Sequence, residues 1–473
     1  MLNPFKKSRT AYNNSSVHKQ VERLRTPRYE LDDSRTNGGQ PGIVVTWWTR
    51  LLSGDIANQD EQYLAHQTSQ DYLFNALGQG AWGALFPLLT VVCSQLVGIE
   101  QAGLFSMAFV VATLLLFIAQ YGVRTYQVSD IAEQRSFSDY QIQRAATVVV
   151  MVIAGLIWCF FKGYTEPMFS ICTGALLFRA VDGMADVYEG RLQQKDKLYL
   201  AGLSQALRCS ASFILFTVVL FVTRNLVWAS WSMGICALIT LVFVSTPLAI
   251  LETDKSVSIK LANIKDIFVQ CWPLFLALFL YNLIDSLPKF AMEGTLSYSN
   301  QLYFNALYFP AHTILMISTL IYRPQLFKLA SLLETSIHNP ANKKRFGVIV
   351  LAMFGAIAVV TIGTAAFVEF IGIPLNGFLY GVDFEQYRGL ARIMVATGGL
   401  CAAIDFLYQL ITIMRVQKAV TRAYLISFAV SIPIIWMMVS FTGLNGAVIG
   451  SFSSILILFL LLISEYAVAR MKN

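Results

Sequence analysis

Residues 271–292, CWPLFLALFLYNLIDSLPKFAM, are apolar enough to form one helix inside a membrane, yet they carry Asn282, Asp285 and Lys289. Offsets of three and seven residues place these three side chains on one face of a helix. An ionisable residue inside a membrane span is by default a candidate functional residue. We therefore expect this polar face to look into a cavity and to act in binding or gating.

Asp285 and Lys289 can also pair with each other, because an acid four residues before a base is the favourable order on a helix. Pro288 lies between them and is expected to disturb the helix. If the span rises outward from about residue 267, Asp285 lies nearly 27 Å along it at roughly 1.5 Å per residue. This depth favours a role in outward gating or release over binding at the membrane centre.

Composition indicates a polytopic membrane protein, with 56% apolar and 13% charged residues and a mean hydropathy of +0.58. The formal net charge of +7 does not indicate nucleic acid, because Lys and Arg lie in short clusters between apolar runs. The seven cysteines fall within apolar runs without a metal-binding spacing, so we expect no metal and no cofactor. A Walker motif is absent from the sequence, so a built-in ATPase is not indicated.

Twelve apolar segments follow residue 71, each near the roughly 20 residues that cross a bilayer as a helix. They are expected at 72–97, 102–122, 145–161, 167–186, 200–222, 226–250, 267–291, 299–322, 346–371, 388–414, 421–441 and 444–468. The predicted fold is therefore all-α, with about twelve transmembrane helices.

Positive charges alternate between the connections, and this pattern predicts the orientation. The tail and every second connection are basic: Arg124, Arg135, Arg144; Arg191, Lys195, Lys197; Lys255, Lys260, Lys265; Arg323, Lys328, Lys343, Lys344, Arg345; Arg415, Lys418, Arg422; Arg470, Lys472. Both termini are therefore expected on the cytoplasmic side of the cell membrane. The outer connections are too short for an external catalytic domain, so we expect a protein that is not an enzyme.

The spans divide six and six at the polar loop of residues 251–266. This predicts a mostly disordered, basic cytoplasmic tail at 1–69, an N-terminal six-helix bundle at 70–250, a cytoplasmic linker at 251–266 and a C-terminal six-helix bundle at 267–473. Within the tail, residues 43–52 with Trp47 and Trp48 suit either the membrane interface or a short helix packed on the cytoplasmic side. If the halves are parallel repeats, the substrate site lies between them.

The first span, DYLFNALGQGAWGALFPLL, would be the counterpart of the seventh and is also polar for a membrane helix, with Asn75 and Gln79. Its glycines, Gly78, Gly80 and Gly83, either allow close helix packing or form a bendable wall of the cavity.

Three stretches resemble the polysaccharide flippases of the multidrug/oligosaccharidyl-lipid/polysaccharide exporter superfamily. They are the first helix followed by VGIEQAGLFSMAFVVATLLLFIAQYGVRTYQVSD, then RAVDGMADVYEGRLQQKDKLYLAGLSQALR, and then WPLFLALFLYNLIDSLPKFAMEGTLSYSNQLYFNALYFPAHTI. The resemblance covers about residues 70–470. It implies two six-helix bundles around a central cavity that opens alternately to either side. The implied cargo is a polyprenyl-diphosphate-linked oligosaccharide or glycopolymer unit, moved from the inner to the outer leaflet.

A diphosphate cannot cross hydrocarbon unshielded, so a flippase needs a wet, cationic cavity. The candidate cations in or near the predicted spans are Arg179, Arg208, Lys289 and Arg392. Each has a structural alternative, since Arg179 can pair with Asp182, and Arg208 with Asp182 or Asp186. Pairing is expected because an unpaired charge costs roughly 2.5–3.5 kcal/mol at the span centre. Loss of Lys289 or Arg208 is expected to impair transport and leave membrane abundance intact.

Asp405 and His312 are candidate proton or sodium sites for an ion-driven transporter, although a hydrogen-bonded structural histidine is the stronger interpretation for His312. The expected function is an ion- or potential-driven flippase, whose partners are the lipid-linked saccharide, membrane lipids and other polysaccharide-assembly proteins. The alternatives are a multidrug/cation antiporter of the same superfamily and a non-transporting scaffold. If the protein is a transporter, residues 70–473 alone would restore export without the tail, and the scaffold interpretation would become redundant.

Overall fold

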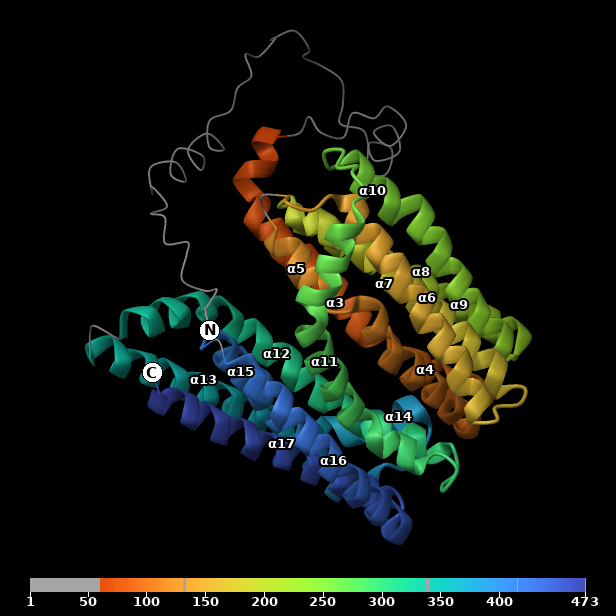
Figure 1. The fold of residues 1–473 in the computed structure, drawn as a ribbon. Coiled ribbons are helices and arrows are strands. Elements are labelled where there is room, and N and C mark those ends of the chain that lie inside the picture. The colour runs from red at the N-terminus through yellow and green to blue at the C-terminus, as the bar shows by residue number, and fades with distance from the viewer. Residues whose placement is uncertain (1–59, 131–132, 337–339, 415, 473) are drawn as a thin grey trace. The chain divides into compact units, whose positions relative to one another are not determined.

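The computed structural model describes residues 60–130, 133–336, 340–414 and 416–472, so the tail segment with Trp47 and Trp48 lies outside the described residues. Across these described ranges the chain is helical, and the one β contact is an isolated bridge between Glu293 and Leu296 (Figure 1). The helices are α3 (Asp60–Val97), α4 (Ile99–Gln120), α5 (Val123–Ser129), α6 (Phe137–Phe161), α7 (Met168–Gln194), α8 (Leu198–Thr223), α9 (Leu226–Thr240), α10 (Thr246–Leu251), α11 (Leu261–Met292), α12 (Ser299–Ser336), α13 (Pro340–Phe367), α14 (Ile373–Tyr380), α15 (Arg388–Ile413), α16 (Gln417–Thr442) and α17 (Leu444–Lys472).

Twelve stretches of the described chain are long and apolar enough to span a membrane, which confirms the predicted number and the all-α fold. The pairs α4 with α5, α9 with α10 and α13 with α14 each make one span. Several helices continue beyond the predicted apolar limits: α3 already begins at Asp60 and α11 at Leu261. Polar residues at a span end can stay helical once they leave the hydrocarbon, so apolar length underestimates the helix.

Helix α11 runs without a break through Pro273 and Pro288, so neither proline ends the helix. A proline removes one backbone hydrogen bond, and the packing of neighbouring helices in a membrane can hold the helix together around it.

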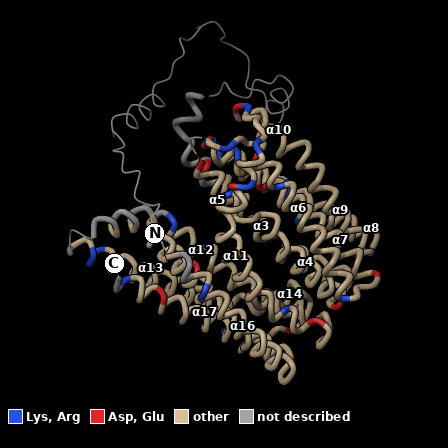
Figure 2. The backbone as a smooth tube through the Cα atoms, in the orientation of Figure 1, with Lys and Arg blue, Asp and Glu red and all other residues tan. Residues whose placement is uncertain are grey.

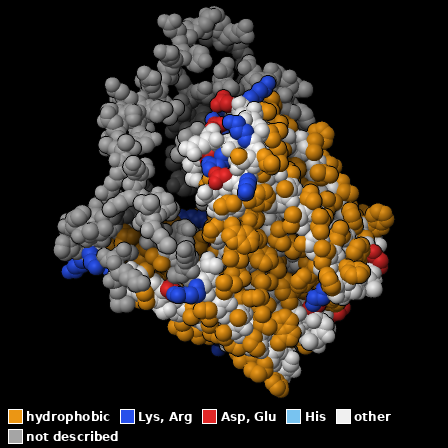
Figure 3. Space-filling view, in the orientation of Figure 1, with side chains coloured by type: hydrophobic (Ala, Val, Ile, Leu, Met, Phe, Trp, Pro, Cys, Tyr) orange, Lys and Arg blue, Asp and Glu red, His pale blue; other side chains and the backbone are white. Residues whose placement is uncertain are grey.

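Charged residues gather at the helix ends, for example around α5 and α10, while the helix middles carry few (Figure 2). Hydrophobic side chains cover the visible face over α6 and α9, as contact with lipid tails requires (Figure 3). We call the end with connections 130–136, 195–197 and 252–260 the basic end. The end with connections 162–167, 293–298 and 381–384 is called the opposite end.

Helices α3–α10, the N-terminal set, pack on one another, with α3 against α8 and α4 against α7. Helices α11–α17, the C-terminal set, do the same, with α12 against α15 and α16 against α17. The two sets meet at the opposite end, where the Glu100 carboxylate accepts hydrogen bonds from the backbone N–H groups of Tyr298 and Ser299, both at 3.0 Å. Asn305 donates to Ser106 there, at 2.8 Å.

A second contact between the sets at the opposite end centres on Glu293, whose side chain is only 5% exposed. Lys162 forms an ion pair with it at 2.6 Å, and the Tyr164 hydroxyl donates a hydrogen bond to it. The Trp158 ring lies 5.0 Å from the Phe290 ring beside this group. We call Lys162, Tyr164 and Glu293 the latch, because they join the connection after α6 to the end of α11.

One glycine of α3 takes the close-packing role considered for these residues. A Cβ atom on Gly78 would lie 2.6 Å from the backbone oxygen of Gly202 in α8, so Gly78 allows the two backbones to approach closely. Gly80 faces open space, with no other atom within 4 Å of its Cβ position.

Gly78→Ala is expected to destabilise the protein by about 1–3 kcal/mol, because the added methyl group overlaps the α8 backbone. Gly80→Ala is the matched control on the same helix, and it should leave stability unchanged or raise it, since alanine favours helix more than glycine. Thermal unfolding of both variants in the same detergent measures the difference. Equal melting temperatures would contradict the assigned packing.

Candidate functional site

A central cavity of about 170 Å³ lies between the N-terminal and C-terminal sets of helices. Its walls come from α3, α4 and α7 on one side and from α11, α12 and α14 on the other. The polar and charged lining residues are Thr90, Thr113, Arg179, Asn282, Asp285, Ser286, Lys289, Asn305, Tyr308, His312 and Tyr380, and the aromatic ones include Trp82, Phe86, Phe109, Phe117 and Phe309. Five of the ten candidate residues from the sequence meet here: Arg179, Asn282, Asp285, Lys289 and His312.

Lys289 provides the positive charge of the C-terminal wall. Its ammonium group lies 3.1 Å from the Asp285 carboxylate and 4.9 Å from the centre of the Tyr308 ring. The Tyr308 hydroxyl donates a hydrogen bond to Asp285, and the Asn282 amide donates to the Leu278 carbonyl at 2.8 Å. The polar face predicted for this helix therefore lines the cavity, and its lysine is balanced by one carboxylate.

Arg179 provides the positive charge of the N-terminal wall, and its side chain is 4% exposed. The guanidinium lies over the rings of Phe109 and Trp82, at 4.5 and 5.1 Å from their centres. It donates to Thr113 at 3.2 Å and pairs with Asp182 at 3.0 Å. Ring faces carry partial negative charge, so they hold a cation in place without neutralising it.

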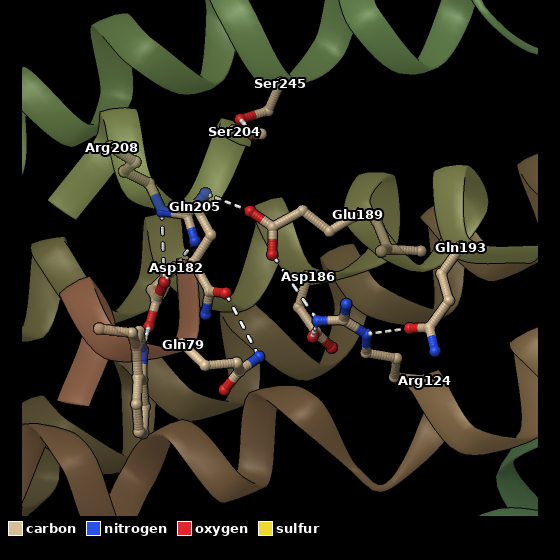
Figure 4. Close-up of polar contacts among 12 residues, drawn as sticks. Gln79, Arg124, Asp182, Asp186, Glu189, Gln193, Ser204, Gln205, Arg208 and Ser245 are labelled. Carbon is tan, nitrogen blue, oxygen red and sulfur yellow. Dashed lines mark hydrogen bonds and ion pairs between the residues drawn. The ribbon is translucent and has the colours of Figure 1, made fainter. Parts of the chain in front are cut away.

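Asp182 connects Arg179 to a buried charge network inside the N-terminal set. Figure 4 shows Asp182 with the other members of this network. Asp182 accepts from Arg208 at 2.7 Å and from the indole N–H of Trp82 at 2.8 Å. Arg208 also pairs with Glu189 at 2.6 Å, and both side chains are at most 2% exposed. Arg208 is therefore held by two carboxylates in the interior, away from the residues that line the cavity.

Asp186 completes the network toward the basic end. It pairs with Arg124 at 3.0 Å and with the fully buried Arg144 at 2.8 Å, and Arg124 also reaches Gln193 (Figure 4). The sequence pattern treated Arg144 as a connection residue, which was wrong, because α6 begins at Phe137 and carries Arg144 inside the bundle.

The other candidates lie outside the cavity lining. Asn75 and Gln79 are on α3, where Gln79 donates to Gln205 of α8 at 3.3 Å (Figure 4). Arg392 is 65% exposed and pairs with Glu369 at 2.7 Å. Asp405 accepts a hydrogen bond from the Tyr322 hydroxyl within the C-terminal set.

Sequence reasoning missed several residues that shape the site. Glu189 lies seven residues after Asp182, on the same stripe of α7, and this spacing was available in the sequence. Trp82, Phe109 and Tyr308 carried no comparable signal, because aromatic residues are frequent throughout the apolar spans. Tyr380 is the last residue of α14, beyond the end predicted for this span at residue 371, and its hydroxyl lies 3.2 Å from the Thr90 hydroxyl across the cavity.

A family model described as "Polysaccharide biosynthesis protein" matches residues 70–327. The chain belongs to this family. The match confirms the resemblance recognised in the three sequence stretches, and it covers the N-terminal set from residue 70 onward together with α11 and most of α12. No curated protein matches the chain.

Solved structures show the same fold at low sequence identity. The chain is 14% identical to an inward-facing multidrug resistance MATE family transporter of the MOP superfamily, with a TM-score of 0.60 over 83% of this chain and 96% of that one. It is 14% identical to a MOP superfamily transporter from Pyrococcus furiosus, described by the reverse polarity of its binding pocket, with a TM-score of 0.57 over 86% and 95%. It is 15% identical to the Vibrio cholerae MATE transporter VcmN in its bent form, with a TM-score of 0.54 over 86% and 97%.

This polysaccharide biosynthesis protein has twelve candidate membrane spans in its described residues. It shares its fold with transporters of the MOP superfamily. The three proteins of known structure are described as transporters.

Arg208→Ala is expected to deplete the folded protein from the membrane, in contrast to the intact abundance expected from sequence. The change leaves Asp182 and Glu189 buried without this partner, a loss of about 3–5 kcal/mol. Arg392→Ala removes an exposed arginine and should keep normal abundance. Immunoblotting of membranes and melting in detergent compare the two variants. Normal abundance and stability of Arg208→Ala would contradict its structural role.

Proposed function

We propose that this family member is a flippase that moves polyprenyl-diphosphate-linked oligosaccharide or glycopolymer precursors from the inner to the outer leaflet of the cell membrane. The observation that carries the proposal is the central cavity, with Arg179 on one wall and Lys289 on the other. Both cations lie beside aromatic rings in a largely enclosed wall, where water competes weakly with an anionic ligand.

The charge balance around the cavity favours an anionic cargo. In the N-terminal network, Arg124, Arg144, Arg179 and Arg208 contact three carboxylates, those of Asp182, Asp186 and Glu189. On the other wall, Lys289 is balanced by Asp285. One positive charge therefore remains among these contacting residues, and Arg179 is the network member that reaches the cavity. A diphosphate would supply compensating charge and accept hydrogen bonds from the guanidinium.

The remaining lining suits a saccharide head group. Trp82, Phe86 and Tyr308 offer ring faces to the apolar faces of sugar rings, and Asn282 and Asn305 offer amides to hydroxyl groups. Family membership in polysaccharide biosynthesis agrees with this lining.

Alternating access would carry the cargo between leaflets. The contacts at Glu100, Ser106 and Glu293 hold the two sets together at the opposite end. If the termini and the basic end are cytoplasmic, as the positive charges predict, these contacts close the cavity toward the outside of the cell. Release on the outside then requires these contacts to break.

The second candidate is a multidrug/cation antiporter, since the chain shares its fold with a multidrug resistance MATE family transporter. The polarity of the binding pocket distinguishes the two functions. An organic cation would meet Arg179 and Lys289, and like charges in a pocket of low dielectric repel strongly. The polarity here therefore favours the flippase.

Lys289→Ala is expected to raise the cargo concentration needed for half-maximal flipping about tenfold to a hundredfold, because a hydrogen bond to a charged group contributes about 1.5–3 kcal/mol. Lys289→Arg should keep most activity. Proteoliposomes with a fluorescent polyprenyl-diphosphate saccharide and an external quencher measure the exchange between leaflets. Lys265→Ala, an exposed cation on the same helix, is the control for charge. Wild-type protein that moves organic cations but leaves the saccharide lipid in place would refute the flippase.

Asp405 is our candidate for coupling to a proton or sodium gradient. Its carboxylate is half-buried, and its partner in the described structure is the neutral Tyr322 hydroxyl, with no ion pair to a base. Asp405→Asn is expected to abolish the acceleration of flipping by an imposed gradient and to leave the gradient-free rate nearly unchanged. Asp383→Asn, an exposed acid at the opposite end, is the matched control. An Asp405→Asn protein with wild-type gradient dependence would exclude this assignment.

A further inference from the structure

The first half of α11 packs into the N-terminal set, although topology assigns the helix to the C-terminal half. Ile267 and Cys271 are buried in a small hydrophobic cluster whose other buried members are Val123, Phe137, Tyr140 and Val187. Those four residues belong to α5, α6 and α7. A buried cluster holds its helices together more firmly than exposed polar contacts do.

Polar contacts reinforce this attachment at the basic end. The Asp139 carboxylate, at the start of α6, accepts from the Lys260 backbone N–H at 2.9 Å and from the Asn263 amide at 2.8 Å. Arg135 forms an ion pair with Asp266, and its Nε lies 3.1 Å from that carboxylate. The first turns of α11 are thus bound to the same element that carries Phe137 and Tyr140.

Connection 252–260 is also fixed to the N-terminal set. Lys197 pairs at 2.5 Å with Glu252, whose side chain is 2% exposed. Arg191 donates to the Asp254 carbonyl at 3.0 Å, and the Phe137 backbone N–H donates to the Ser256 hydroxyl at 3.1 Å. A connection held along its length is a poor pivot for movement between the two sets.

Contacts of α11 change partner in the middle of the helix. Tyr121, the residue after α4, stacks on Phe275 with ring centres 4.6 Å apart, and its neighbour Gly122 packs against Leu274. Two turns later, Tyr281 faces Tyr424 of α16, and Asp285 binds Tyr308 of α12. The change falls just after Pro273, which cannot donate a backbone hydrogen bond to the preceding turn.

A groove beside Pro273 leaves the helix room to bend. It lies between α11 and α16 and is lined by Trp272, Pro273, Leu276, Leu425 and Ile426, among others. Helices bend most easily where a proline interrupts the hydrogen-bond ladder. The groove and the missing hydrogen bond therefore lie at the part of α11 where its contacts pass from the N-terminal set to the C-terminal set.

We infer that α11 is divided between two moving bodies, with residues 261–272 travelling with the N-terminal set, residues 277–292 with the C-terminal set, and a pivot at Pro273–Leu276. The inference rests on the alternating access proposed above, and it does not depend on the cargo. It moves the boundary between the bodies from the loop predicted at residues 251–266 into the helix.

Spin-label distances between three exposed sites, Gln134, Lys265 and Lys344, test the division. They lie before α6, in the first half of α11 and in α13. Pairs of cysteines are labelled at these sites in the full chain with Cys236→Ser, because the six other native cysteines are buried. Distances are measured by pulsed electron paramagnetic resonance in nanodiscs, before and after the latch is broken by Glu293→Ala. Lys162→Ala removes the same ion pair from the other side and serves as the second trigger.

Breaking the latch is expected to shorten the 134–344 and 265–344 distances together and to leave the 134–265 distance unchanged. Pro273→Ala in the same background should suppress most of the shortening, whereas Pro288→Ala, in the same helix beyond the pivot, should preserve it. Lys265 moving with Lys344 would overturn the inference, and so would a 134–344 distance that responds to neither trigger. These distances require no cargo, so a failed flipping assay would refute the proposed function and leave this result standing.

Discussion

The cost of placing charge inside a membrane governs how the N-terminal set is built. An unpaired charge at the centre of a span costs roughly 2.5–3.5 kcal/mol, so the charged residues of α7 need partners from other helices. Asp182, Asp186 and Glu189 follow one stripe of α7 and receive arginines from α5, α6 and α8. Satisfying these pairs fixes the positions of four helices relative to one another. Arg179, which shares Asp182 with Arg208, is the arginine of this network that lines the cavity.

Features that depend on one helix at a time could be predicted from the sequence. Apolar length determined the twelve spans, because hydrocarbon thickness sets the length of a spanning helix. The periodicity of Asn282, Asp285 and Lys289 placed them on one face, and the structure brings all three to the cavity. The spacing of four residues between Asp285 and Lys289 also predicted the ion pair that they form.

Features that depend on contacts between helices could not be predicted to the same extent. Arg179 and Arg208 are both arginines in apolar surroundings, yet one lines the cavity and the other is enclosed by two carboxylates. Only the packing of α7 against α8 distinguishes them. Arg392 lies near the start of α15. It is exposed there and forms an ion pair with Glu369. Helix ends were misplaced for a related reason, since tertiary contacts such as those at Asp139 hold polar turns in helical form.

The division of α11 that we infer connects the cavity to the contacts at the opposite end. Lys289 lies one turn before Glu293, whose backbone N–H donates to the Lys289 carbonyl at 3.2 Å. The Gln301 amide at the start of α12 donates to the same carbonyl at 2.6 Å. The cavity lysine and the latch carboxylate therefore share one rigid helix end. Because this end belongs to the C-terminal body and Lys162 belongs to the N-terminal body, a displacement of Lys289 acts directly on the contact that closes the opposite end.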